Sequence, residues 1–330
     1  MKLRSNRRPF EVIFVCFCMA AWFSAVSVVW SQEEGYPRKP VEIISVSQPG
    51  GANDVATRIV VQELTPKLKV PVLIINNQAA GGMMGVVMLL KAKPDGYTLS
   101  SVSTSSLIMA PLQSPNPPFD TFVDLKPICS IGYAAISFVV HKSSPFKTLE
   151  ELIKYAKENP GKLTCGVGNL GRGPHFNLEI FKKTAAVDIK TIPYKGPAEV
   201  TPALLGKHID MAVQTHASNL PYLKSGEMRG LAVTARVPNS GIRTTAEIGY
   251  PKVNLKEVQA FYVSAKTPKG IYEKLVPLFE EVVKNPTITK KLEPNGILGE
   301  YMSPSAVTTQ MKGDWDSISK LVEELGLKQK

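Results

Sequence analysis

The chain has 330 residues, of which 44% are hydrophobic and 20% are charged. This composition supplies enough apolar material for a core, excludes general disorder, and fits a chain of two domains. The formal net charge is +11, but the Lys and Arg residues are spread out and form no basic block interleaved with aromatics. A nucleic-acid partner is therefore disfavoured, whereas a modest positive field suits an anionic ligand.

The N-terminus has the pattern of an export segment. Basic residues between Lys2 and Arg8 precede an uncharged stretch over residues 12–30, which is the order of a signal peptide. We predict an export signal over residues 1–31 and a periplasmic location for the folded part. The stretch is also long enough to span a bilayer, so an uncleaved membrane anchor is the alternative.

Strands and helices alternate along the first part of the chain. A short β-branched run is followed by a glycine-rich turn and then by helical spacing of apolar residues, and this order repeats. The expected elements are strands at 41–46, 72–75 and 97–102, helices at 55–68 and 84–90, and turns at 48–54 and 78–82. Alternation of this kind predicts a parallel α/β sheet.

A second α/β set follows the first. Thr148 and Glu151 form a capping box at the start of one of its helices. The expected elements are strands at 136–141, 163–167, 189–194, 208–214, 229–234 and 261–264, helices at 148–159, 175–183, 199–205 and 268–284, and a glycine-rich turn at 168–174. Two such sets with a late return segment predict two domains and a hinge.

The sequence shows no catalytic or metal-binding cluster. Hydrolytic chemistry requires a nucleophile beside a base, or a set of metal ligands, and the four histidines are isolated: His141, His175, His208 and His216. Only His175, beside a glycine turn, has the context of a functional base, and it lacks an orienting partner. We therefore predict that the chain is not an enzyme and uses no metal or cofactor.

Two cysteines, Cys129 and Cys165, remain outside the export segment. They are too few for a disulfide scaffold. Pairing is permitted in an exported protein, but both residues lie in strand-like sequence, so we favour two buried free thiols.

Three glycine-rich turns follow predicted strands. Each turn alone is weak evidence for a binding site, because such a turn ordinarily serves as a tight connection between a strand and a helix. Together they are more informative, since the carboxyl ends of parallel strands share an edge, where helix N-termini point free N–H groups at a common crevice. Each N–H bond to a charged group contributes about 1.5–3 kcal/mol. The turns therefore predict a crevice that binds a small anion.

Several short motifs of this chain have the same order and spacing as those of one known family. They are Pro49-Gly50-Gly51-x-x-Asp54, Ala80-Gly81-Gly82-x-x-Gly85, Lys93-Pro94-Asp95-Gly96-Tyr97-Thr98-Leu99, Asn159-Pro160-Gly161-Lys162-Leu163, Pro193-Tyr194-Lys195-Gly196 and Ala246-Glu247-Ile248-Gly249-Tyr250-Pro251. From Tyr36 to nearly the C-terminus, the chain resembles the Bug-type extracytoplasmic solute-binding proteins of the tripartite tricarboxylate transporter family. The resemblance implies a type II periplasmic-binding-protein fold, with two α/β domains joined by a hinge and a ligand cleft between them. The implied limits are residues 36–137 plus 261–330 for domain 1 and 138–260 for domain 2.

The resemblance also implies which residues bind the ligand. The near wall comprises Pro49, Gly50, Gly51, Asn53, Asp54, Ala79, Ala80, Gly81 and Gly82, with Thr104, Ser105 and Ser106 adding hydroxyls. The far wall comprises Gly168, Asn169, Arg172, Gly173, His175, Tyr194, Lys195, Gly196 and Asp210. Several have alternative roles: Asp54 as an N-cap, Tyr194 as a core residue, Lys195 as a solvated charge, Asp210 as a turn residue, and Arg172 either on a second acidic group or in solvent.

The function implied is a monomeric periplasmic receptor that captures a small organic acid and delivers it to the large and small membrane subunits of a transporter. The alternative is a binding protein that presents its ligand to a membrane histidine kinase. Some residues depart from the family pattern. Ala79 stands where glycine is usual, and Phe261 and Tyr262 stand near the place of a usual tryptophan. These departures leave the identity of the ligand open.

Overall fold

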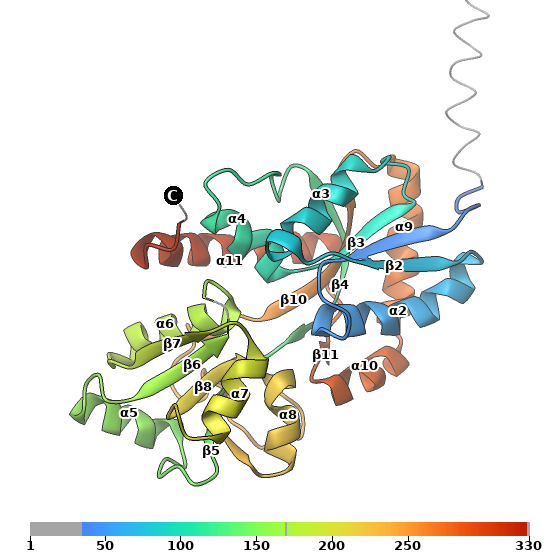
Figure 1. Ribbon diagram of the computed structural model, residues 1–330. Coiled ribbons are helices and arrows are strands. Elements are labelled where there is room, and N and C mark those ends of the chain that lie inside the picture. The colour runs from blue at the N-terminus through green and yellow to red at the C-terminus, as the bar shows by residue number, and fades with distance from the viewer. Residues whose placement is uncertain (1–34, 169, 329–330) are drawn as a thin grey trace, which may run out of the picture.

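The computed structural model describes residues 35–168 and 170–328. They form two lobes, each built on one β-sheet, with lobe 1 above lobe 2 in Figure 1. The export signal predicted over residues 1–31 and the predicted ligand residue Asn169 lie outside the described residues. Within the described part of the chain, no helix combines the length and apolarity needed to cross a bilayer.

Lobe 1 is built on a six-stranded sheet with the strand order β11-β4-β10-β3-β1-β2. Its strands are β1 (Val41–Ser45), β2 (Val72–Asn76), β3 (Thr98–Ser103), β4 (Leu125–Ala134), β10 (Glu257–Ser264) and β11 (Leu298–Gly299). Strand β1 runs parallel to β2 and β3, whereas β10 runs antiparallel to β3 and β4. The three strands from which a parallel sheet was predicted are parallel, and antiparallel β10 joins them because the chain returns from the other lobe.

Helices cover both faces of this sheet. The longer elements are α2 (Ala52–Leu68), α3 (Met83–Lys91), α9 (Lys269–Val283), α10 (Pro286–Leu292) and α11 (Pro304–Glu324), and the short ones are η1 (Ala79–Gly82), η2 (Ser105–Met109), α4 (Ala110–Gln113) and η3 (Glu293–Asn295). Helices α2, α9 and α10 pack on one face around Phe261. Helices α3 and α11 pack on the other face around Val102 and Tyr262.

Lobe 2 is built on a five-stranded sheet with the order β7-β6-β8-β5-β9. Its elements are β5 (Ile136–His141), α5 (Leu149–Glu158), β6 (Thr164–Gly168), α6 (Gly173–Ala185), β7 (Lys190–Tyr194), α7 (Pro197–Leu205), β8 (Met211–Thr215), α8 (His216–Lys224) and β9 (Met228–Val233). Strand β6 is parallel to β7 and β8, but β5 is antiparallel to β8 and β9. The Thr148 side chain accepts the Glu151 N–H at the start of α5, which confirms the predicted cap.

The chain crosses between the lobes twice. It leaves lobe 1 between the end of β4 at Ala134 and the start of β5 at Ile136, and it returns in the segment before β10 begins at Glu257. The strand predicted at 261–264 thus begins four residues earlier. On this topology we propose lobe limits of 36–134 plus 257–328 and of 136–255, a few residues ahead of those predicted.

Both predicted thiols are free and buried, Cys129 in β4 and Cys165 in β6. Burial raises the pKa of each thiol. Because the two residues belong to different sheets, they serve as small apolar groups in separate cores.

The core of lobe 1 depends on Phe261, which is fully buried and packs edge-on against Phe279 with ring centroids 4.8 Å apart. We expect Phe261→Ala to lower the free energy of unfolding by about 3–5 kcal/mol, because the cavity it leaves cannot refill. Urea unfolding followed by circular dichroism measures the change. The matched control is Val123→Ala at a 67% exposed position, and equal losses for the two variants would contradict this packing.

Candidate functional site

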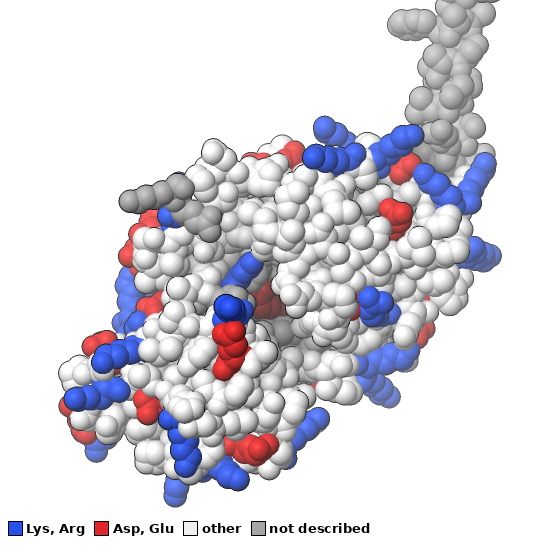
Figure 2. All heavy atoms as spheres, viewed as in Figure 1, with Lys and Arg blue, Asp and Glu red and all other residues white. Residues whose placement is uncertain are grey.

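A cleft of about 1050 Å³ lies between the two lobes. Figure 2 shows this hollow, with basic and acidic side chains at its rim and acidic atoms within it. The predicted ligand residues that line it come from both lobes: Gly50, Gly51, Asn53, Gly81, Ser105, Gly168, Arg172 and Lys195. The structure therefore brings the three predicted glycine turns to one cavity.

The first glycine turn carries the N-terminus of α2 to the cleft. Gly50 has a φ of 77°, which favours glycine, and Gly51 is the N-cap of the helix. Residues Gly51, Ala52 and Asn53 all line the cleft. Because the first N–H groups of an α-helix have no acceptor within the helix, this turn presents donors and a partial positive charge to an anion.

Asp54 holds this turn in place from outside the cleft. Its side chain is 1% exposed and does not line the cavity. One carboxylate oxygen accepts from the Gly50 N–H at 2.9 Å and from Arg58 Nε at 2.8 Å, and the other accepts from Asn76 Nδ2 at 2.8 Å. Asp54 is thus a positioning residue that reaches back to the chain before the helix.

The second glycine turn approaches the far lobe closely. Gly82, with a φ of 93°, leaves no room for a side chain, because a Cβ there would lie 2.3 Å from Ser106 Oγ. A Cβ on Gly81 would lie 2.4 Å from a guanidinium nitrogen of Arg172. Gly81 lines the cleft, whereas Gly82 is buried behind it. The turn therefore provides a bare backbone surface facing Arg172.

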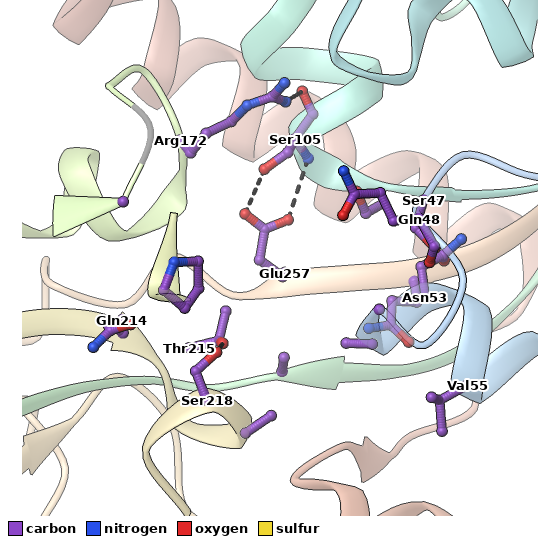
Figure 3. Close-up of a pocket in the computed structure, with 18 of the residues that line it drawn as sticks. Ser47, Gln48, Asn53, Val55, Ser105, Arg172, Gln214, Thr215, Ser218 and Glu257 are labelled. Atoms are coloured by element: carbon purple, nitrogen blue, oxygen red, sulfur yellow. Dashed lines mark hydrogen bonds between the residues drawn. The ribbon is translucent and has the colours of Figure 1, made fainter. Parts of the chain in front are cut away.

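Arg172 joins the two lobes across the cleft. It precedes α6 in lobe 2, and its Nη1 donates to the Ser105 carbonyl oxygen of lobe 1 at 3.3 Å (Figure 3). Beside it, Gln113 Nε2 of lobe 1 donates to the Gly171 carbonyl oxygen at 2.8 Å. Burial lowers the pKa of Arg172 while Glu257 opposes that change, and the guanidinium stays charged at any physiological pH.

Glu257 brings a negative charge into the same cavity. Ser105 Oγ donates to Glu257 Oε1, and the Ser105 N–H donates to Oε2 at 3.4 Å (Figure 3). Glu257 is the first residue of β10, in a stretch for which the sequence predicted no strand. The alternation of Glu257 and Gln259 around an apolar residue was the available signal, because both side chains line the cleft from one face of β10.

Several predicted residues support the walls without lining the cleft. His175 Nδ1 accepts the Gly171 N–H at 3.0 Å, and burial lowers its pKa. Thr104 Oγ1 pairs with the backbone of Val258 at 3.1–3.3 Å. The predicted residues outside the lining are Pro49, Asp54, Ala79, Ala80, Gly82, Thr104, Gly173, His175, Tyr194, Gly196 and Asp210.

Two of these residues have clear structural roles. Tyr194 packs against the core around α7, which agrees with its alternative role. Asp210 binds the Thr164 backbone N–H and hydroxyl at 2.8 and 2.7 Å. Asp210 precedes β8, whereas the cleft lies at the carboxyl end of that strand. Asp210 and the cleft are therefore at opposite ends of β8.

Ser106, which was expected to add a hydroxyl, also lines the cleft. Sequence reasoning did not assign the other polar side chains that complete the lining, which include Ser47, Gln48, Gln78, Ser103, Gln214, Thr215, Ser218, Glu257 and Gln259. Gln214 and Thr215 end a strand that the sequence did predict, so the rule that ligands bind at carboxyl ends of strands could have identified them. In the described part of the lining, neither histidine nor cysteine occurs.

Comparisons with known proteins agree with this architecture. A family model described as "Tripartite tricarboxylate transporter family receptor" matches residues 56–327. A UPF0065 protein of Bordetella pertussis is 29% identical, over 97% of this chain and 99% of that protein. The solved structure of R. palustris Rpa4515 with adipate is 25% identical with a TM-score of 0.77, covering 88% and 99% of the two chains. The structure of the periplasmic binding protein BugD is 25% identical with a TM-score of 0.73, covering 89% and 100%.

The Asp54 network predicts a pH-dependent contribution to stability. Burial alone would raise the pKa of Asp54, but hydrogen bonds from Arg58, Asn76 and Gly50 lower it below its ordinary value. A carboxylate of this kind stabilises the fold above its unfolded pKa of about 3.9, and that contribution is lost as the pH falls toward the folded pKa.

We expect Asp54→Asn to lower the free energy of unfolding by about 1.5–3 kcal/mol at neutral pH, since it removes hydrogen bonds to a charged group. Urea unfolding at neutral pH and below about pH 3.9 measures the pH dependence. The difference between variant and wild type should shrink in acid. The same difference at both pH values would show that the charge of Asp54 is not what stabilises the turn.

Proposed function

Because the chain belongs to the tripartite tricarboxylate transporter receptor family, as a Bug-type solute-binding protein, we propose that it captures a small organic carboxylate in the periplasm for a membrane transporter. The observation that carries the proposal is the cleft between the lobes, where the N-terminus of α2 opposes Arg172. A relative of the same fold is solved with adipate, which supports a carboxylate ligand. The expected membrane partners are the large and small subunits of that transporter.

The donors around the cleft are sufficient for useful affinity. A helix N-terminus contributes about 0.3–1 kcal/mol to anion binding, and each hydrogen bond to a charged group about 1.5–3 kcal/mol. Among the described residues, Arg172 uses one of its five N–H donors on the Ser105 carbonyl, so its other donors can bind a ligand. Together these groups can supply the roughly −8 kcal/mol of a micromolar complex after association costs are met.

The composition of the lining supports a receptor in preference to an enzyme. Ser47, Ser105 and Ser106 line the cleft, but a serine nucleophile needs an adjacent base. The acceptor for Ser105 Oγ is the Glu257 carboxylate, and a carboxylate is ordinarily a much weaker base than the imidazole of a serine hydrolase. His175 faces the turn backbone through Nδ1 and lies 3.7 Å from Glu179 through Nε2, and it is outside the lining. The polar groups of the described lining therefore suit binding and release of an acid without chemical change.

Gly81→Val tests the cleft as the ligand site. The variant places a branched side chain where even a Cβ meets Arg172, at a φ of 69° that disfavours β-branched residues. We expect the dissociation constant of a bound organic acid to rise at least about tenfold, equivalent to 1.4 kcal/mol. Isothermal titration calorimetry with a panel of organic acids, adipate included, measures the change.

The matched control is Gly313→Val, because Gly313 lies in α11 and a Cβ there meets nothing within 4 Å. The control variant should bind as the wild type does. Equal weakening by both variants would point to a general loss of fold. Failure of every organic acid to bind the wild-type chain would contradict the proposed function.

A further inference from the structure

The cleft holds an acidic residue among groups that favour anions. The ionisable side chains of its described lining are Arg172, Lys195 and Glu257. A negative charge in a carboxylate-binding cleft repels a carboxylate that binds close to it. Glu257 therefore favours a ligand that carries a complementary group on the side facing it.

Within the described residues, Glu257 forms no ion pair with lysine or arginine. Its protein donors are the hydroxyl and the N–H of Ser105. An ionised carboxylate accepts about four hydrogen bonds, so Glu257 retains capacity for further donors. The side chain is partly exposed and lines the cleft, so donors of a ligand bound there can reach it.

Two amide oxygens add unpaired acceptors to the same walls. Gln259, two residues beyond Glu257 on β10, and Gln214 of β8 are 2% and 1% exposed, and the Oε1 atom of each has no hydrogen-bond partner. In the structure, Asn219 Nδ2 donates to Ser137 Oγ at 2.8 Å, and Gln214 Nε2 donates to Asn219 Oδ1 at 3.2 Å. This arrangement leaves Gln214 Oε1 without a donor among the described residues, and buried acceptors are costly to leave unpaired.

We propose that Glu257 is a specificity-determining residue that binds a protonated amino group of the ligand, and that the ligand is an organic acid carrying such a cationic nitrogen. This inference rests on the proposed function, because the carboxylate of the same ligand binds at the α2 turn. The lining carries two cations and one anion. An acid with two carboxylates and one ammonium group carries the opposite charges, so each carboxylate has a cation in the lining to pair with and the ammonium group has Glu257.

Pairs of acids that differ by one amino group test the inference. The probes are aspartate and succinate, glutamate and glutarate, and 2-aminoadipate and adipate, titrated calorimetrically at neutral pH against the full-length chain. The tightest-binding amino acid should bind at least about tenfold more tightly than its partner without nitrogen, a difference of 1.4 kcal/mol. Equal or tighter binding of the dicarboxylate would overturn the inference and leave the proposed function intact.

Glu257→Gln separates the charge of the residue from its shape, because a glutamine oxygen still accepts from Ser105. The variant should lose most of the preference for the amino member of each pair. The control is Glu273→Gln, whose side chain is 61% exposed on α9, and it should keep that preference. If Glu257→Gln keeps it as well, the inference is wrong.

Two further outcomes remain distinct. If Glu257→Gln fails to fold, as judged by its thermal melt, Glu257→Asp takes its place. The aspartate keeps the charge one methylene further back, so the amino acid should bind more weakly while the dicarboxylate binds no more tightly than to the wild type; unchanged amino-acid binding would overturn the inference. If the wild-type chain binds another organic acid but neither member of any pair, the inference is wrong and the proposed function stands. If it binds no organic acid at all, both fail.

Discussion

The contact of Ser105 with Glu257 and Arg172 joins the three parts of the chain on which the cleft depends. Ser105 begins the turn after β3 in lobe 1, Glu257 begins the strand on which the chain returns, and Arg172 precedes α6 in lobe 2. Arg172 binds the Ser105 carbonyl, and Glu257 accepts the Ser105 hydroxyl and N–H. Ser105 therefore links lobe 1 both to lobe 2, through Arg172, and to the returning strand β10, through Glu257. These contacts hold the two walls of the cleft close together.

The topology explains why these residues meet. Sheet strands β1 and β3 are parallel, so the turns that follow them open on one edge, and β6 and β8 do the same in lobe 2. The two crossings of the chain between sheets hold those edges face to face. Helix N-termini and amide groups then gather at the cavity, while buried charges such as Asp54 remain behind the wall and fix its backbone. The groups that line the cleft are therefore different from the groups, such as Asp54, that hold its backbone in position.

The sequence was most informative where a local pattern determines structure. The periodic helices, the Thr148 cap and the order of the glycine turns all follow from neighbouring residues, and the periplasmic-binding-protein fold of two α/β domains is confirmed. Strand β4 was missed because Pro127 and Gly132 interrupt its pattern and its pairing with β10 contains bulges. Glu257 was missed for a different reason: the alternation at 257–259 indicates a strand, but the place of Glu257 in the cleft depends on its contact with Ser105, 152 positions away in the chain.

The central claim is that the two lobes hold a carboxylate between the α2 turn and Arg172. A crystal structure of the chain with its bound acid tests this claim most directly. The account predicts a carboxylate within hydrogen-bonding distance of the N–H groups at Ala52 and Asn53, with Arg172 on the opposite wall. Density for the acid outside this cleft, or a carboxylate that contacts neither the α2 turn nor Arg172, would contradict it.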